Sequence, residues 1–347
     1  LGKLDAIVCA LWVESDVRKG THSSAKLMMP TSTETRVIRA SAVRSFLVEP
    51  IARDVYAILG GEHPNAAFIV SNEGVLVIDA RPTVQDTKEL RDAIRSITDA
   101  PITHLVWTHG HRANSAVART LGAPVIVSQR RCRAFIEERG DAPGEIERLL
   151  DGVIESREAH ALLPNLTFDR EIDLHWGGRH ILIANYGRGH TAGDLILHIP
   201  SERLLITGDL VQNNVTPFAG DGYLEQWTQT LTRLSKLSAN VALPGRGGLL
   251  TGDEVGQTLR ETSEYLGVLR HAVQDVVERE GTLADAVQFA HQMLAPQFGH
   301  WDRFHRQLAY NVGRAYEEVS GSHPRKWSES RRWHLMEELG ADDAQHS

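Results

Sequence analysis

The stretch Thr108-His109-Gly110-His111-Arg112-Ala113-Asn114 follows the apolar run Leu105-Val106-Trp107 and holds two histidines one residue apart. In extended backbone, alternate side chains point to the same side, so both imidazoles can face one ion. At the turn that follows a strand, this pattern is typical of the start of a metal site. Two partly exposed loop histidines would give the same pattern, so its meaning depends on the rest of the chain.

Three further short segments carry polar side chains next to apolar strands. Gly189-His190-Thr191-Ala192-Gly193 places a third histidine between glycines, and Thr207-Gly208-Asp209 places a carboxylate at the end of a strand. Pro244-Gly245-Arg246 follows the last short strand. Neutral imidazoles and carboxylates suit a borderline divalent ion such as zinc. Three nitrogens plus a water is the open, catalytic form of such a site.

The hydrophobic pattern predicts strands and helices that alternate within two halves, followed by helices alone. Such an order favours an α/β sandwich with helices outside two sheets. The turn Asn72-Glu73-Gly74 lies between two β-branched runs and predicts a hairpin. Strands are predicted at 53–59, 67–70, 75–78, 102–107, 124–127, 172–175, 180–183, 195–199, 204–207 and 241–243, and helices at 83–97, 130–154, 224–237, 255–280, 283–294 and 304–319.

Composition excludes several classes of protein. The 347 residues are 41% hydrophobic and carry a net charge of -8 without a long Lys/Arg run, which argues against nucleic-acid binding. No apolar run approaches the ~20 residues of a membrane span. Cys9 and Cys132 form no Cys-x-x-Cys pair, so no thiolate zinc site is expected, and a reduced, cytoplasmic protein is the default expectation. Whether a signal peptide was removed before residue 1 is left open.

In the order of these motifs, the chain resembles the metallo-β-lactamase superfamily, particularly its glyoxalase II-like metallohydrolases. The hairpin from Asn65 to Asp79 also matches, and the resemblance covers roughly residues 50–250. The segment 301–317, with Asn311-Val312-Gly313-Arg314-Ala315-Tyr316, looks like the helical tail of some members. The resemblance implies a four-layer αβ/βα sandwich with a C-terminal helical extension and the site at one edge of the two sheets.

This resemblance also suggests how the chain is divided. We expect an N-terminal arm at residues 1–42, a metallo-β-lactamase-like domain at 43–252 and a C-terminal helical extension at 253–347 packed on that domain.

The family's first metal site uses three histidines, and the matching residues here are His109, His111 and His190. All three ligands of that site are kept. The resemblance therefore implies one divalent ion, expected to be zinc. Iron is the alternative, because imidazole accepts both metals. Asp209 matches the carboxylate that bridges the two ions in the family, and we expect it beside the ion as a ligand and as a catalytic group.

The departures from the family fall on its second metal site. Ala113 and Asn114 stand where the family has aspartate and histidine, and Arg246 stands where it has its last histidine. Alanine has no donor atom, and arginine is always charged and cannot ligate. Only Asp209 remains of that set, so the sequence predicts a degenerate second site and a mononuclear centre.

Two roles are open for Arg246. Its guanidinium can bind a substrate carboxylate or a developing oxyanion, which would make it a catalytic residue. Alternatively, it forms a salt bridge with Asp209 that fills an unused site. Asp79 resembles the family's aspartate near the site and is expected to hydrogen-bond the loop that carries the histidines.

The expected function is that of a metal-dependent hydrolase cleaving an ester, thioester, lactone or similar bond of a small molecule. The ion would lower the pKa of a bound water towards ~7 and polarise the substrate oxygen. Two alternatives keep the same fold: a non-catalytic binding module, favoured by the lost ligands, and an iron-dependent redox or lyase enzyme. Neither a nucleic-acid nor a membrane partner is expected, whereas homodimer contacts through the arm and the helical tail are left open.

Overall fold

The computed structural model describes residues 46–321, apart from 62, 114 and 140–161. These residues belong to the second of two compact units into which the chain divides, residues 45–347. The arm expected at 1–42 and the predicted helix beyond Arg139 therefore lie outside the described residues. In the described part of the chain, none of the helices is both long enough and apolar enough to cross a membrane.

The first sheet contains seven strands in sequence order. Its first four strands pair antiparallel, and the pairs from the fourth strand to the seventh are parallel. All five residues of the fourth strand are buried, as expected for a strand that is covered on both faces. The strands are β1 (Leu47–Ala52), β2 (Val55–Leu59), β3 (Ala66–Ser71), β4 (Gly74–Ile78), β5 (Ile102–Val106), β6 (Val125–Gln129) and β7 (Leu166–Phe168).

The second sheet contains six strands in the order β13-β12-β11-β10-β9-β8. Only β11 and β12 are parallel neighbours, while the other pairs are antiparallel. The strands are β8 (Glu171–Trp176), β9 (Arg179–Ala184), β10 (Ile196–Ile199), β11 (Leu204–Gln212), β12 (Val241–Arg246) and β13 (Leu250–Thr251).

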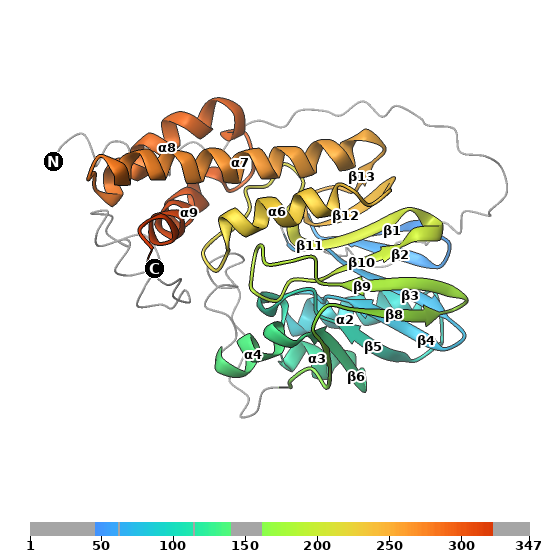
Figure 1. Ribbon diagram of the computed structural model, residues 1–347. Coiled ribbons are helices and arrows are strands. Elements are labelled where there is room, and N and C mark those ends of the chain that lie inside the picture. Colours follow the sequence, from blue (N-terminus) through green and yellow to red (C-terminus); the bar gives the residue numbers. More distant parts are fainter. Residues whose placement is uncertain (1–45, 62, 114, 140–161, 322–347) are drawn as a thin grey trace. The chain divides into compact units, whose positions relative to one another are not determined.

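Helices cover the outer face of each sheet, and a third core lies between the sheets (Figure 1). Apolar residues that alternate along the strands fill the inner core, for example Leu76 of the first sheet and Ile183 and Leu197 of the second. Outside the first sheet lie α2 (Val84–Arg95), α3 (Ser115–Leu121) and α4 (Arg130–Arg139), and outside the second lie α6 (Leu224–Leu234) and α7 (Asp253–Glu278). These layers confirm the predicted αβ/βα sandwich.

The predicted C-terminal helices are present: α8 (Leu283–Phe298) and α9 (Phe304–Val319) pack against α7. A capping box formed by Thr282 and Asp285 begins α8. The helices bury Leu294, Phe298 and Leu308 in the core that they share with the second sheet. Helices α7, α8 and α9 are therefore part of the same hydrophobic core as the second sheet.

Some elements differ from the prediction. Strand β11 continues through Asp209 to Gln212, whereas the sequence predicted a strand at 204–207 with Asp209 at its end. Gly208 has a φ of 54°, and the pairing with β12 shifts register there, so a turn-like residue stands inside a strand. The short elements β1, β7, β13 and α3 were not predicted, because two to seven residues carry little periodicity.

Candidate metal centre

The predicted site residues lie within or just after strands of both sheets, or between two strands. Asp79 follows β4, and His109 follows β5 just before the short 3-10 helix η1 (Gly110–Arg112). His190 lies between β9 and β10, and Asp209 lies within β11. Because the carboxyl ends of parallel strands meet at one edge of a sheet, this topology brings residues far apart in sequence together.

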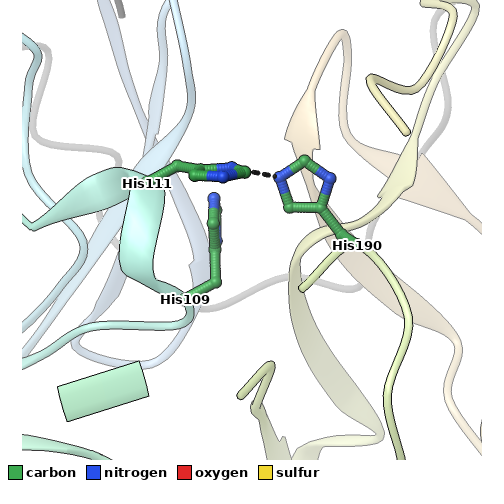
Figure 2. Close-up of side chains that lie close together, drawn as sticks. All are labelled: His109, His111 and His190. Atoms are coloured by element: carbon green, nitrogen blue, oxygen red, sulfur yellow. Dashed lines mark hydrogen bonds between the residues drawn. The ribbon is translucent and has the colours of Figure 1, made fainter. Parts of the chain in front are cut away.

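The three histidines point toward one another (Figure 2). One ring nitrogen from each of His109, His111 and His190 lies within 4.8 Å of the other two. Their exposures are 1%, 4% and 0%, so the cluster is enclosed by protein. The structure thus places three potential ligand atoms around one point, where they could hold a single ion.

Two of the rings make a hydrogen bond on the side that faces away from the other histidines. These outer hydrogen bonds fix which ring nitrogen carries a proton. His190 Nδ1 lies 2.9 Å from the Phe218 carbonyl, which can only accept, so Nδ1 carries the hydrogen and Nε2 keeps its lone pair. His111 Nε2 lies 2.8 Å from the Asp221 carboxylate, so a neutral His111 ring carries its hydrogen on Nε2 and its lone pair on Nδ1. These two lone pairs face each other across 2.8 Å.

The third ring is fixed through Thr108. The Thr108 hydroxyl donates to Asp79 Oδ2 at 2.7 Å and therefore accepts from His109 Nδ1 at 3.0 Å. His109 Nε2 is left with a lone pair that points inward, and it is buried with no hydrogen-bond partner among the described residues. Three inward lone pairs repel one another unless a cation lies between them, so this donor set fits a divalent metal ion.

Burial also keeps the rings of His109 and His190 neutral. It lowers the pKa of His190 to about 3 and holds the pKa of His109 well below its usual value, although Asp209 opposes both shifts. A neutral imidazole is the form that binds a metal, so these two rings need not lose a proton to coordinate one near pH 7.

Asp209 lies between the histidines and two arginines. Its Oδ2 is 3.9 Å from both His109 Nε2 and His190 Nε2. Its Oδ1 accepts a 2.6 Å hydrogen bond from Arg112, which also donates to the Gly245 carbonyl. Burial by itself would raise the pKa of Asp209, but Arg112, the two histidines and the second arginine together hold it well below its usual value. The side chain of Asp209 is therefore ionised.

Arg246 ends β12 and is the second arginine beside Asp209. Its Nε lies 4.0 Å from Asp209 Oδ2, and its side chain is buried. The short ion pair of Asp209 is thus with Arg112, and Arg246 approaches the other carboxylate oxygen from β12. Ala113 packs against the apolar cluster outside the first sheet and offers no ligand atom, while Asn114 lies outside the described residues.

Asp79 holds the loop that carries the first two histidines. Its Oδ1 accepts from the backbone N–H of Thr108 at 2.9 Å, and its Oδ2 accepts from the Thr108 hydroxyl. Its backbone has a φ of 55°, a left-handed conformation that is unfavourable for most residues other than glycine. Burial raises the pKa of Asp79 to about 6, although Arg112 and the bonds from Thr108 act to lower it.

Sequence reasoning assigned no role to Arg112, Asp221 or the Phe218 carbonyl. Arg112 lies inside the histidine motif, but no sequence pattern shows that its side chain turns back onto Asp209. Asp221 stands between Gly220 and Gly222, and that pattern could have identified it, as it did for His190. A backbone carbonyl leaves no signal in the side chains.

Comparison with known proteins places the chain in a family. The family model of the metallo-beta-lactamase superfamily matches residues 59–246. Metallo-beta-lactamase IND-1 of Chryseobacterium indologenes is 22% identical over 235 residues, covering 63% of this chain and 90% of that protein. A linear primary-alkylsulfatase of a Pseudomonas species is 21% identical over 238 residues, covering 58% of this chain and 45% of that protein.

Solved structures agree on the fold. A metallo-beta-lactamase from Pontibacter korlensis has a TM-score of 0.52 at 19% identity, covering 63% of this chain and 99% of that one. Metallo-beta-lactamase IND-7 has a TM-score of 0.52 at 22% identity, covering 64% of this chain and 100% of that one. At such identities the likeness concerns the fold alone. The family model, however, spans more than half of the residues, and the chain therefore belongs to the metallo-beta-lactamase superfamily.

Proposed function

We propose that this chain is a metal-dependent hydrolase with a single ion held by His109, His111 and His190. The observation that carries the proposal is that one nitrogen lone pair of each of the three imidazoles points to the same place. The other nitrogen of each ring is held by a hydrogen bond on the outer side of the cluster. Zinc suits three nitrogen ligands with one open position, and iron is the alternative. When bound, such an ion lowers the pKa of a water and polarises a substrate oxygen.

We further propose that the second metal site of the family is degenerate here. Arg112 and Arg246 flank Asp209 and carry two unit positive charges, the charge of one divalent ion. Ala113 offers no donor in the same region. Fixed guanidinium groups can therefore supply the electrostatic effect of a second ion without binding one.

Arg112, Asp209 and Arg246 have different roles in the proposed reaction. Arg112 fixes Asp209 through Oδ1, which leaves Oδ2 on the side of the histidines. We assign to Oδ2 the orientation of the attacking water and the acceptance of its proton. We assign to Arg246 the stabilisation of negative charge that develops on the substrate oxygen.

The proposed substrate is a small molecule with an ester, thioester, lactone or similar bond, as for a glyoxalase II-like member. The relatives named above widen the set to be tested to a β-lactam and a primary alkyl sulfate. All of these reactions place negative charge on an oxygen, which a buried cationic site stabilises.

Metal analysis tests the proposal. Protein purified with added zinc, and in parallel with iron, should hold about one ion per chain. His190→Ala should lose that ion and with it hydrolysis of the panel of substrates. Two ions per chain would contradict the degenerate second site, and absence of any ion would favour the binding-module alternative. One iron without hydrolysis would favour redox or lyase chemistry.

Kinetics separate the two roles proposed for Arg246. If its guanidinium stabilises developing charge, Arg246→Ala should lower kcat by about 10²–10³ with the metal retained. If it only neutralises Asp209, the variant should change stability and leave kcat near that of the wild type. Asp209→Asn should lower kcat in either case, because it removes the proton acceptor.

The organisation of the chain is proposed from the sequence alone. We propose the arm at 1–42, the domain at 43–252, the extension at 253–347 and a cytoplasmic location. Homodimer formation is left to experiment. Limited proteolysis should cut first within the arm, and size-exclusion chromatography with light scattering should give the oligomeric state. A cut near residue 252 that releases a stable extension would contradict the packing of the extension on the domain.

A further inference from the structure

One face of α9 contacts a loop at the metal centre. The loop, residues 213–223, connects β11 to α6. The helix residues are Asn311, Arg314 and Glu318, which are spaced three and four apart and so share one side of the helix. This helix lies beyond residue 246, where the match to the family model ends.

The same loop supplies the outer partners of two metal-site histidines. The Phe218 carbonyl accepts from His190, and the Asp221 carboxylate lies 2.8 Å from His111 Nε2. The position of this loop therefore fixes the orientation of two of the three rings.

A single peptide unit joins His190 to the helix. The carbonyl of Phe218 and the N–H of Ala219 belong to one planar peptide, and in the trans form they point in opposite directions. The carbonyl accepts from His190 Nδ1 at 2.9 Å, and the N–H donates to Asn311 Oδ1 at 2.7 Å. Hydrogen bonds in such a chain polarise one another, so Asn311 strengthens the carbonyl as an acceptor for His190.

The amide of Asn311 is held in one orientation. Its Nδ2 donates to the Pro217 carbonyl at 2.8 Å and to the Tyr265 hydroxyl at 2.9 Å, and its side chain is completely buried. A carbonyl can only accept and an N–H can only donate, so the Oδ1 atom must face Ala219. Asn311 thus holds the chain on both sides of Phe218.

Two further residues of α9 fix the far end of the loop. Arg314 Nε donates to the Gly222 carbonyl at 2.7 Å. Glu318 accepts from the backbone N–H groups of Leu224 and Glu225, the first two residues of α6. A carboxylate at a helix N-terminus is stabilised by the helix dipole, so this contact pins the loop where α6 begins.

We propose that Asn311 is a positioning residue for the metal centre. It acts through the 218–219 peptide to fix and polarise the hydrogen bond that orients His190. Helix α9 of the C-terminal extension then contributes to the function of the metal site, although it supplies none of the three histidines. This inference rests on the proposed metal site, but not on the reaction that the site catalyses.

The test is the zinc affinity of Asn311→Leu, measured by competition with a chromophoric chelator. Leucine is similar in size and has no acceptor for the Ala219 N–H. Loss of an outer partner of a ligating histidine lowers metal affinity by about 10–100-fold, and the effect here should be about tenfold. The absorption bands of the cobalt-loaded variant should also shift, because His190 is no longer held in one orientation.

Thr262→Val is the matched control. Thr262 is buried in α7, and its hydroxyl donates to the Thr258 carbonyl at 2.8 Å. The control removes one buried hydrogen bond from the helical extension, so it should destabilise the protein while zinc affinity stays within about twofold of the wild type. If Asn311→Leu does not fold, Asn311→Ser replaces it, since the shorter side chain cannot bridge Pro217 and Ala219.

The outcomes are distinct. Wild-type zinc affinity and an unchanged cobalt spectrum in the Asn311 variant would overturn the inference. A wild-type protein that binds no zinc or cobalt would overturn the proposed function and the inference together. A wild type that binds one ion but hydrolyses nothing, with weaker binding in Asn311→Leu, would overturn the hydrolase proposal alone.

Discussion

Arg112 and Asp209 form a buried ion pair that joins the two sheets of the sandwich. Arg112 follows β5 of the first sheet, and its Nη2 lies 2.6 Å from Asp209 Oδ1 on β11 of the second sheet. The two side chains are 6% and 3% exposed. Arg112 also donates to the Gly245 carbonyl on β12, so one guanidinium contacts both β11 and β12, the two parallel neighbours of the second sheet.

Removing one partner of this pair should destabilise the protein strongly. Arg112→Met leaves the Asp209 charge buried without its closest counterion, which costs about 3–5 kcal/mol. Urea unfolding of the metal-free protein measures the loss. The double variant Arg112→Met/Asp209→Asn removes both charges and should recover part of the stability. A single variant within about 1 kcal/mol of the wild type would show that the pair has no such role.

Asp221 should be required for tight metal binding. Asp221→Asn places an amide, which can present a donor instead of an acceptor, beside His111 Nε2 and so disturbs the tautomer that leaves Nδ1 free for the ion. Zinc affinity should fall about 10–100-fold. Asp173→Asn is the control, because Asp173 contacts an exposed histidine, His180, on the second sheet. Equal affinities of the two variants would contradict the role of Asp221.

The sequence predicts those parts of this protein that depend on local pattern. The alternation of apolar residues predicts most strands, and the small-residue turns predict where the three histidines stand. Apolar periodicity follows from burial on one face, and glycine beside a histidine follows from a tight turn. Each of these two signals is contained within a few neighbouring residues of the chain.

The contacts made over long distances in sequence could not be predicted. Arg112 and Asp209 are 97 residues apart, and Ala219 and Asn311 are 92 apart. Nothing in the residues next to Arg112 or Asn311 shows that these polar side chains become buried, and only the fold decides it. The outer shell of the metal centre is therefore a property of the tertiary structure.

Gly245 should tolerate no side chain. A Cβ atom at this position would overlap Asp209 Oδ1 and lie 2.7 Å from the Asp209 backbone nitrogen, so β11 and β12 would have to separate. Gly245→Ala should cost about 1–3 kcal/mol through overpacking and lower zinc affinity by moving Asp209. Urea unfolding measures the loss of stability, and chelator competition measures the zinc affinity.

Gly267→Ala is the matched control for Gly245→Ala. Gly267 lies in α7, and a Cβ atom there would meet nothing within 4 Å. Alanine is more favourable than glycine inside a helix by about 1 kcal/mol, so this variant should be slightly more stable with unchanged metal binding. Equal stability losses in the two variants would contradict the steric argument at Gly245.

Asp194 should make the stability of the metal-free protein depend on pH. Its carboxylate closes the turn after His190, accepting from the Thr191 backbone N–H at 2.9 Å and from the Thr191 hydroxyl at 2.5 Å. Burial raises the pKa of Asp194 from its ordinary 3.8 to about 7, although the bonds from Thr191 oppose the shift. Between these two values the folded protein keeps a proton that the unfolded chain releases.

The sign of the effect follows from this difference in proton binding. The contribution of Asp194 to the free energy of unfolding is fully present below pH 3.8 and is lost as the pH rises through about 7. Asp194→Asn cannot titrate, so the stability of the wild type relative to this variant should fall between about pH 5 and about pH 8. Urea unfolding of both metal-free proteins at the two pH values measures the change. A difference that stays constant, or that moves in favour of the wild type at the higher pH, would show that Asp194 is ionised in the folded protein throughout this range.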